Sequence, residues 1–152
     1  MKDHAFEFFH SASRFCRTAE QYGSNQEEER AKMKDLLSVL IDLYAKALSL
    51  PETEIAEHAN KEGELDYEIP SIDFQLGGEY WEVFDPYERD EPVQVALSDD
   101  ILDIYKDVKS GIFLYEKGFH QAALWNWKFM FEIHWGMHAS DAIRAMHWAI
   151  HR

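Results

Sequence analysis

The sequence has little cysteine and lacks long apolar runs. Cys16 is the only cysteine among 152 residues, which excludes an intramolecular disulfide and a zinc site built from several thiolates of one chain. No stretch approaches the roughly 18 apolar residues that cross a bilayer, and the first residues lack the basic start and apolar core of a signal peptide. We therefore expect a cytoplasmic protein that does not contact membranes.

Basic residues are scarce in the middle of the chain. Residues 51–100 carry sixteen acidic side chains against Lys61 and Arg89 alone, whereas the segments on either side are nearly neutral. The whole net charge of −14 therefore falls within this third of the sequence. Because such a surface repels phosphate groups, we expect no nucleic-acid partner, and the charge instead suits a basic protein partner.

Outside this acidic third, apolar residues recur at helical spacing. They predict main helices over residues 3–22, 25–48, 98–117, 119–135 and 140–151, with Ser98 as an N-cap. Pro51 can start a short helix over 51–59, and two aromatic side chains four residues apart predict another over 79–84. We expect an all-α fold: one domain over 1–152, an antiparallel bundle of about five main helices, with an irregular acidic segment containing proline and glycine over about 51–97.

An aspartate cluster begins the predicted helix at 98, and comprises Asp99, Asp100, Asp103 and Asp107. Carboxylates spaced three or four residues apart on a helix can converge on one divalent cation. On a helical wheel, however, the four aspartates span about 100° and lie largely opposite the apolar stripe. The interpretation we favour is a solvated helix face, and the alternative is a metal or basic-partner site.

A histidine pair, His134 and His138, has the spacing of two imidazoles that can hold one zinc or iron ion. If the helix continues through Gly136, both histidines share an apolar stripe with Trp127. This placement favours buried histidines that bond to carbonyl groups or to carboxylates such as Asp42. Metal ligation is the alternative.

Four aromatic residues in the acidic segment alternate with acidic residues: Tyr80, Trp81, Phe84 and Tyr87. Such a strip can dock on a partner, because aromatic side chains often dominate binding interfaces. The same residues can instead anchor the segment to the core of the protein, which is the interpretation we favour.

The sequence contains no HExxH zinc motif, no GxSxG motif and no phosphate-binding loop. It therefore assigns no catalytic residue and predicts no cofactor. A non-catalytic helical module that acts through protein contacts, or in regulation, fits these features best. The alternative is a metal-dependent enzyme in which the aspartate cluster, the histidine pair or both hold a divalent ion.

Two strings, LSDDILDIYKD over 97–107 and HWGMHA over 134–139, resemble those of an uncharacterised bacterial family known only as a domain of unknown function. A WNW string over 125–127 belongs to the same pattern. The resemblance implies a small helical protein and carries no particular activity. It also places the aspartate and histidine strings together as the features typical of the family.

Overall fold

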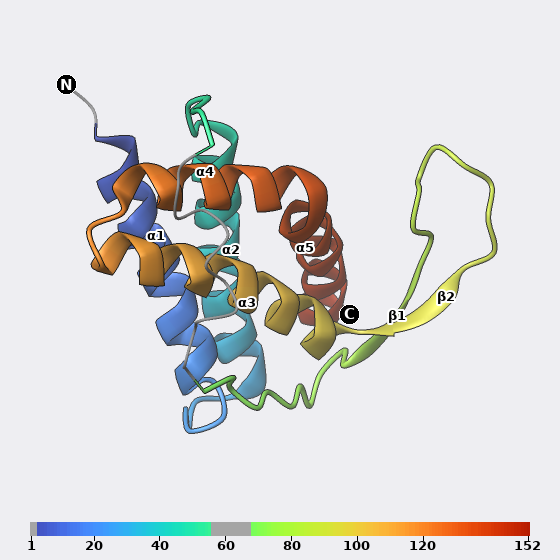
Figure 1. Ribbon diagram of the computed structural model, residues 1–152. Helices are drawn as coiled ribbons and strands as arrows, with labels where there is room; N and C mark the ends of the chain where they lie inside the picture. The colour runs from blue at the N-terminus through green and yellow to red at the C-terminus, as the bar shows by residue number, and fades with distance from the viewer. Residues whose placement is uncertain (1–2, 56–67) are drawn as a thin grey trace.

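The computed structural model describes residues 3–55 and 68–152, and within these ranges the chain is mostly helical (Figure 1). The elements, in chain order, are α1 (His4–Gln21), α2 (Glu29–Leu48), β1 (Glu79–Glu82), β2 (Val93–Ala96), α3 (Leu97–Glu116), α4 (His120–Met130), the π-helical turn η2 (Phe131–Trp135) and α5 (Gly136–His151). Residues 51–55 form no helix, and the rest of the short helix predicted over 51–59 lies outside the described residues.

Four helical segments pack together, because α4, η2 and α5 follow one another without a break. The end predicted at residue 135 and the start predicted at 140 are therefore wrong. Helix α1 packs on α2 and α3, α5 packs on the same two helices, and α4 packs on α3. Figure 1 shows α3 and α4 lying across α1 and α2. No helix in the described ranges combines the length and apolarity needed to cross a membrane.

Side-chain caps start α1 and α2, and the starts of α2 and α3 differ from prediction. An oxygen of Asp3 accepts a hydrogen bond from Phe6 N at the start of α1 (3.0 Å). Helix α2 begins after Glu28, whose carboxylate accepts from two backbone amides, and not at residue 25. The N-cap of α3 is Ala96, and the helix begins at Leu97. The predicted Ser98 cap is therefore wrong. Strand β2 runs straight into α3, which leaves no separate capping loop.

The fold is not all-α, because β1 and β2 form an antiparallel two-stranded sheet. Glu79 pairs with Ala96 and Glu82 pairs with Val93, so the short helix predicted over 79–84 is wrong. Exposure alternates along β1, as expected for a strand with one covered face. We call residues 79–96 the arm; the ribbon shows it projecting away from the helices (Figure 1).

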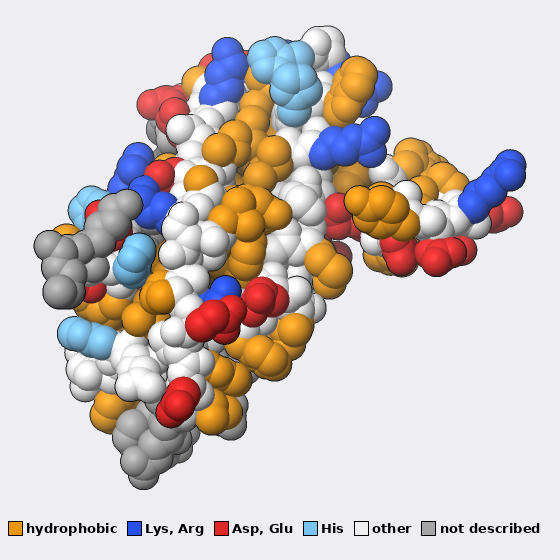
Figure 2. Space-filling model, turned by 90° about the horizontal axis from the view of Figure 1, so that it is seen from above, with side chains coloured by type: hydrophobic (Ala, Val, Ile, Leu, Met, Phe, Trp, Pro, Cys, Tyr) orange, Lys and Arg blue, Asp and Glu red, His pale blue; other side chains and the backbone are white. Residues whose placement is uncertain are grey.

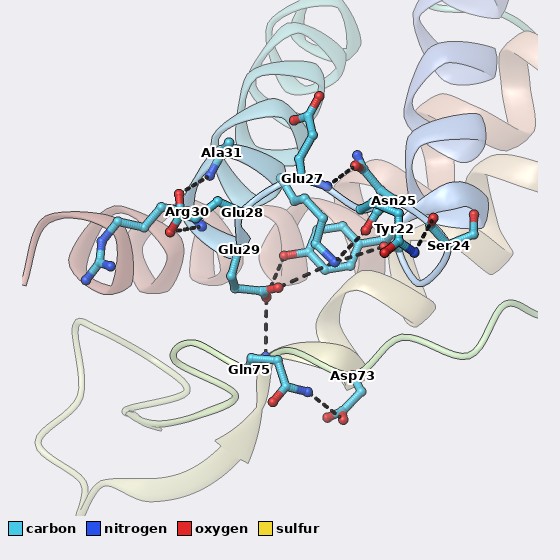
Figure 3. Close-up of polar contacts among 12 residues, drawn as sticks. Tyr22, Ser24, Asn25, Glu27, Glu28, Glu29, Arg30, Ala31, Asp73 and Gln75 are labelled. Carbon is cyan, nitrogen blue, oxygen red and sulfur yellow. Dashed lines mark hydrogen bonds and ion pairs between the residues drawn. The ribbon is translucent and has the colours of Figure 1, made fainter.

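The segment before the arm is tied to α2 through Glu29 (Figure 3). An oxygen of Glu29 accepts from the Tyr22 hydroxyl (2.8 Å) and from Gln75 N (3.3 Å). The Gln75 side-chain amide donates to Asp73 (3.0 Å), and the ring of Phe74 packs against that of Tyr22 with centroids 5.0 Å apart. These contacts fix the chain as it approaches the base of the arm.

The centre of the core is built on Trp127. Its ring is fully buried, packs on Phe8 with centroids 4.7 Å apart, and donates from Nε1 to the Val108 carbonyl (3.0 Å). A Cβ atom at Gly111 would lie 2.0 Å from Trp127 Nε1, so α3 can approach α4 only because residue 111 has no side chain.

We expect Gly111→Ala to destabilise the protein by about 1–3 kcal/mol, because overpacking outweighs the helix propensity gained with alanine. Urea unfolding followed by circular dichroism measures the change. Glu116→Ala on the exposed end of α3 is the control, and we expect it to change stability by less than about 0.5 kcal/mol. Equal stability of Gly111→Ala and wild type would contradict this packing.

Candidate functional site

Asp100 is the most deeply buried acidic side chain among the described residues, with 4% of its surface exposed. One carboxylate oxygen accepts a short hydrogen bond from the Tyr80 hydroxyl, and the other lies 2.7 Å from His138 Nδ1. A buried carboxylate needs such partners, because desolvation without them costs several kcal/mol. The three side chains come from β1, α3 and α5, so they join the arm to two helices.

Two more aspartates of α3 meet the histidine pair. Asp103 Oδ2 lies 3.3 Å from His138 Nε2, so His138 stands between two carboxylates. Asp107 Oδ2 lies 2.5 Å from His134 Nδ1. The two imidazole rings meet edge to face with centroids 4.8 Å apart. The result is one cluster in which each histidine has a carboxylate at its Nδ1 atom.

The π-helical turn η2 determines how the histidines face α3. In an ideal α-helix Trp135 would lie about 80° around the axis from Trp127. Because a π turn contains more residues, Trp135 is brought back to the same buried side, where its Nε1 donates to the Trp127 carbonyl (3.2 Å). The Gly136 amide closes the turn on the Phe131 carbonyl, and a Cβ atom at Gly136 would lie only 2.4 Å from that oxygen. Glycine at 136 thus permits the turn, and His134 stays at the edge of the core.

The cluster contains a potential metal-ligand set. Asp103, His134 and His138 each offer one ligand atom, and these atoms lie within 4.8 Å of one another. Bonds of about 2.0 Å to a tetrahedral ion place ligand atoms about 3.3 Å apart, so small side-chain rotations would close the set. When a carboxylate holds Nδ1–H of an imidazole, Nε2 carries the lone pair that a metal requires. Asp100 and Asp107 stand in this orienting position.

The cluster opens to a pocket beneath the arm. Asp103 and His138 form part of its wall together with Asp99 and two arm residues, Glu79 and Glu82. Asp99 is exposed, whereas Asp103 and Asp107 are half-buried. A small molecule or water can therefore reach two of the three potential ligands directly from solvent.

The predicted solvated face of aspartates is correct for Asp99 and wrong for Asp100. The helical wheel was misleading because α3 has two covered sides: its apolar stripe faces the core, and the next strip faces α5 and the arm. The histidines bond to carboxylates, which were one of the two kinds of partner expected beside carbonyl groups. Asp42 is not among these carboxylates. Asp42 accepts from Ser11 and Lys46 instead.

The four aromatic residues of the acidic segment separate into two groups. Tyr80 points inward and bonds to Asp100, so it anchors the arm and belongs to the cluster. Trp81, Phe84 and Tyr87 expose 66%, 71% and 95% of their surface, and they do not anchor the segment to the core. Sequence reasoning missed the role of Tyr80 in the cluster, and a strand alternation of inward Tyr80 with outward Trp81 would have indicated it.

The cluster changes the acidity of two of its members. The hydrogen bond with Asp100 and the nearby charges of Asp100, Asp103 and Asp107 raise the pKa of His138, against the opposing effect of burial. Burial, together with the hydrogen bond to Asp100, raises the pKa of Tyr80 well above its usual range. The Tyr80 hydroxyl therefore remains a donor to the buried carboxylate at any physiological pH.

The fold and the cluster define a class of protein: a small helical protein with a projecting hairpin arm and a His–Asp cluster at the base of that arm. The chain belongs to the family DUF5063, a domain of unknown function, whose model matches residues 1–152. The resemblance inferred from the aspartate and histidine strings is therefore confirmed.

A solved structure has the same fold. The crystal structure of protein BF1032 from Bacteroides fragilis matches with a TM-score of 0.71 and 22% sequence identity. The match covers 96% of this chain and 91% of that one. The comparison with curated proteins gave no match. These similarities establish the family and the fold, and they assign no activity.

We expect Tyr80→Phe to lower the free energy of unfolding by about 1–3 kcal/mol, because Asp100 would remain buried with one hydrogen bond fewer. Tyr87→Phe is the matched control: its ring is 95% exposed, so the same loss of a hydroxyl should have little effect. Chemical denaturation of both variants measures the difference. Similar stabilities for the two variants would show that the Asp100 contact contributes little.

The raised pKa of His138 predicts a pH-dependent stability of the metal-free protein. Because the folded-state pKa exceeds the unfolded value of about 6.5, the contribution of protonated His138 is fully present below that pH. It is lost as the pH rises through the folded-state pKa. We expect His138→Asn to destabilise the protein more at about pH 5.5 than at about pH 9 in urea unfolding with a chelator present. Equal effects at both values would contradict the prediction.

Proposed function

We propose that this protein binds one divalent transition-metal ion through Asp103, His134 and His138. The observation that supports the proposal is the convergence of three ligand atoms within 4.8 Å, with both histidines already oriented by carboxylates. Two imidazoles and one carboxylate suit zinc or another first-row ion better than magnesium or calcium, which prefer oxygen ligands alone.

The number of ligands favours a site that acts on a bound molecule over a purely structural site. Structural zinc ions have four protein ligands, whereas three protein ligands leave a position for water or substrate. Asp103 and His138 line the open pocket beneath the arm, so such a molecule has access. A bound ion would supply a polarised water or hold an oxygen of a substrate there. Asp100 and Asp107 would keep Nε2 of each imidazole directed at the ion.

We expect the metal-stripped protein, prepared without a histidine tag, to bind one Zn²⁺ ion per chain in isothermal titration calorimetry and to melt at a higher temperature with Zn²⁺. Alanine at His134, His138 or Asp103 should abolish this binding. Asp107→Asn, which removes only an orienting charge, should weaken it about 10–100-fold.

The matched control is the double variant His147→Ala/His151→Ala. It removes an exposed histidine pair of the same spacing on α5, whose rings lie 4.7 Å apart. We expect this control to bind Zn²⁺ as wild type does. Circular dichroism of every variant separates lost binding from lost folding. Wild-type affinity in His134→Ala/His138→Ala, or no binding by wild type, would overturn the proposal.

A second candidate function is contact with a basic protein partner through the arm. It is supported by the exposure of Trp81, Phe84 and Tyr87 beside acidic residues. We expect a lysine-rich peptide to bind more weakly as salt rises, because salt screens exposed charge pairs. Loss of this binding in Glu88→Gln/Asp90→Asn would support the arm as the contact surface. Unchanged binding would place the contact elsewhere on the acidic surface.

A further inference from the structure

The arm is tied to the helices by few polar contacts. At its base, Leu97 N donates to the carbonyl of Gly78 (2.9 Å). Beyond that point, and among the described residues, the bond from Tyr80 to Asp100 is the only side-chain hydrogen bond or ion pair that joins the arm to a helix. Figure 2 shows the arm projecting from the body and joined to it at one end. The position of the arm therefore depends on this contact with Asp100.

Asp100 connects the arm to the proposed metal site. Its two carboxylate oxygens have different partners: one accepts from the Tyr80 hydroxyl, and the other lies 2.7 Å from His138 Nδ1. Because Asp100 holds Nδ1, the Nε2 atom of His138 is left to bind the ion, and it lies 3.3 Å from Asp103 Oδ2. A continuous chain of contacts thus runs from the arm to the position of the ion.

The Tyr80 hydroxyl limits the rotation of the Asp100 carboxylate. The terminal torsion of an aspartate is broad and roughly two-fold, so a carboxylate with one hydrogen bond is freer to turn. With both oxygens bonded, the oxygen that faces His138 stays in place, and the imidazole keeps one tautomer and one orientation. A ligand already held in its bound orientation loses less conformational entropy when the ion arrives. Loss of the hydroxyl should therefore weaken metal binding, although Tyr80 is not a ligand.

The arm also forms part of the wall of the pocket to which the metal site opens. Glu79 and Glu82 of β1 line this pocket together with Asp103 and His138. Movement of the arm away from α3 would open the site to solvent and release one oxygen of Asp100. Both changes loosen the ligand set, so the docked arm and the bound ion favour each other.

We propose that Tyr80 is a positioning residue for the metal site, and that the arm and the ion stabilise each other through Asp100. The docked arm raises the affinity of the site for its ion, and the bound ion holds the arm against the helices. By linkage, the factor is the same in both directions. This inference rests on the metal binding proposed for Asp103, His134 and His138, and it adds regulation of that site by the arm.

Removal of the hydroxyl tests the effect of the arm on the ion. Tyr80→Phe keeps the ring that packs against the core, so the variant should fold, and circular dichroism checks this. Competition with a chromophoric chelator measures the dissociation constant for Zn²⁺. We expect Tyr80→Phe to raise it about tenfold, the low end of the effect of losing a partner outside the ligand shell. Tyr87→Phe is the matched control and should leave it unchanged, because its ring is 95% exposed.

Hydrogen exchange tests the effect of the ion on the arm, and in wild type it needs no substitution. A two-stranded hairpin is marginally stable on its own, so the amides that pair β1 with β2 should exchange through local opening. We expect saturating Zn²⁺ to slow their exchange about tenfold in wild type and to have little effect in Tyr80→Phe. Lower stability alone would speed exchange equally with and without Zn²⁺. The hydrogen-bonded amides of Ser24 and Asn25, in the turn after α1, are the internal control and should not respond.

Failure of this inference and failure of the proposed metal binding give different results. If wild type binds Zn²⁺, wild-type affinity in Tyr80→Phe would overturn the coupling and leave the metal site standing. Arm amides that do not respond to Zn²⁺ in wild type would overturn it as well. If wild type binds no Zn²⁺, both the metal site and its coupling to the arm are wrong.

Discussion

Burial of the Asp100 carboxylate is the constraint on which the arrangement of this protein depends. A carboxylate that is only 4% exposed is stable in the folded protein only where hydrogen-bond donors reach it. Here the donors are Tyr80 on the arm and His138 on α5. The start of α3, the base of the arm and the first turn of α5 are therefore fixed relative to one another. Because β2 leads directly into α3, the register of the hairpin also fixes where Asp100, Asp103 and Asp107 lie.

The π-helical turn satisfies two demands that a regular helix could not satisfy together. Trp127 and Trp135 both have to be buried, and His134 and His138 both have to face the aspartates of α3. An α-helix would separate the two tryptophans around its axis, whereas the π turn aligns them. Gly136 is the local feature that allows this, since a side chain there would collide with the Phe131 carbonyl. Packing and the geometry of the cluster thus depend on the same short string, HWGMHA.

Periodicity was sufficient to predict most of the helices, because each buries one apolar stripe whose spacing is local. It failed at Tyr80, because the spacing of four residues between Tyr80 and Phe84 suggested a helix. Tyr80 lies in strand β1, and Phe84 lies beyond the end of that strand. It also failed at Asp100, because a helical wheel shows one stripe and cannot show that α5 and the arm cover a second side of α3. His138 lies 38 residues from Asp100 in the sequence, and His134 lies 27 residues from Asp107. No local sequence pattern encodes contacts between residues so far apart.

The charge of the cluster connects its two possible states. Asp100, Asp103 and Asp107 together place three negative charges around two imidazoles, and an arrangement this close needs positive charge. One divalent ion bound to the neutral rings would supply a charge of +2, and the same carboxylates raise the pKa of His138 and so favour a proton on that ring. Because the ion and the proton on His138 offset the same negative charge, metal uptake would compete with protonation of His138 and weaken at low pH. Positive charge from either source offsets part of the repulsion among the three aspartates, which lie close together within an already acidic protein.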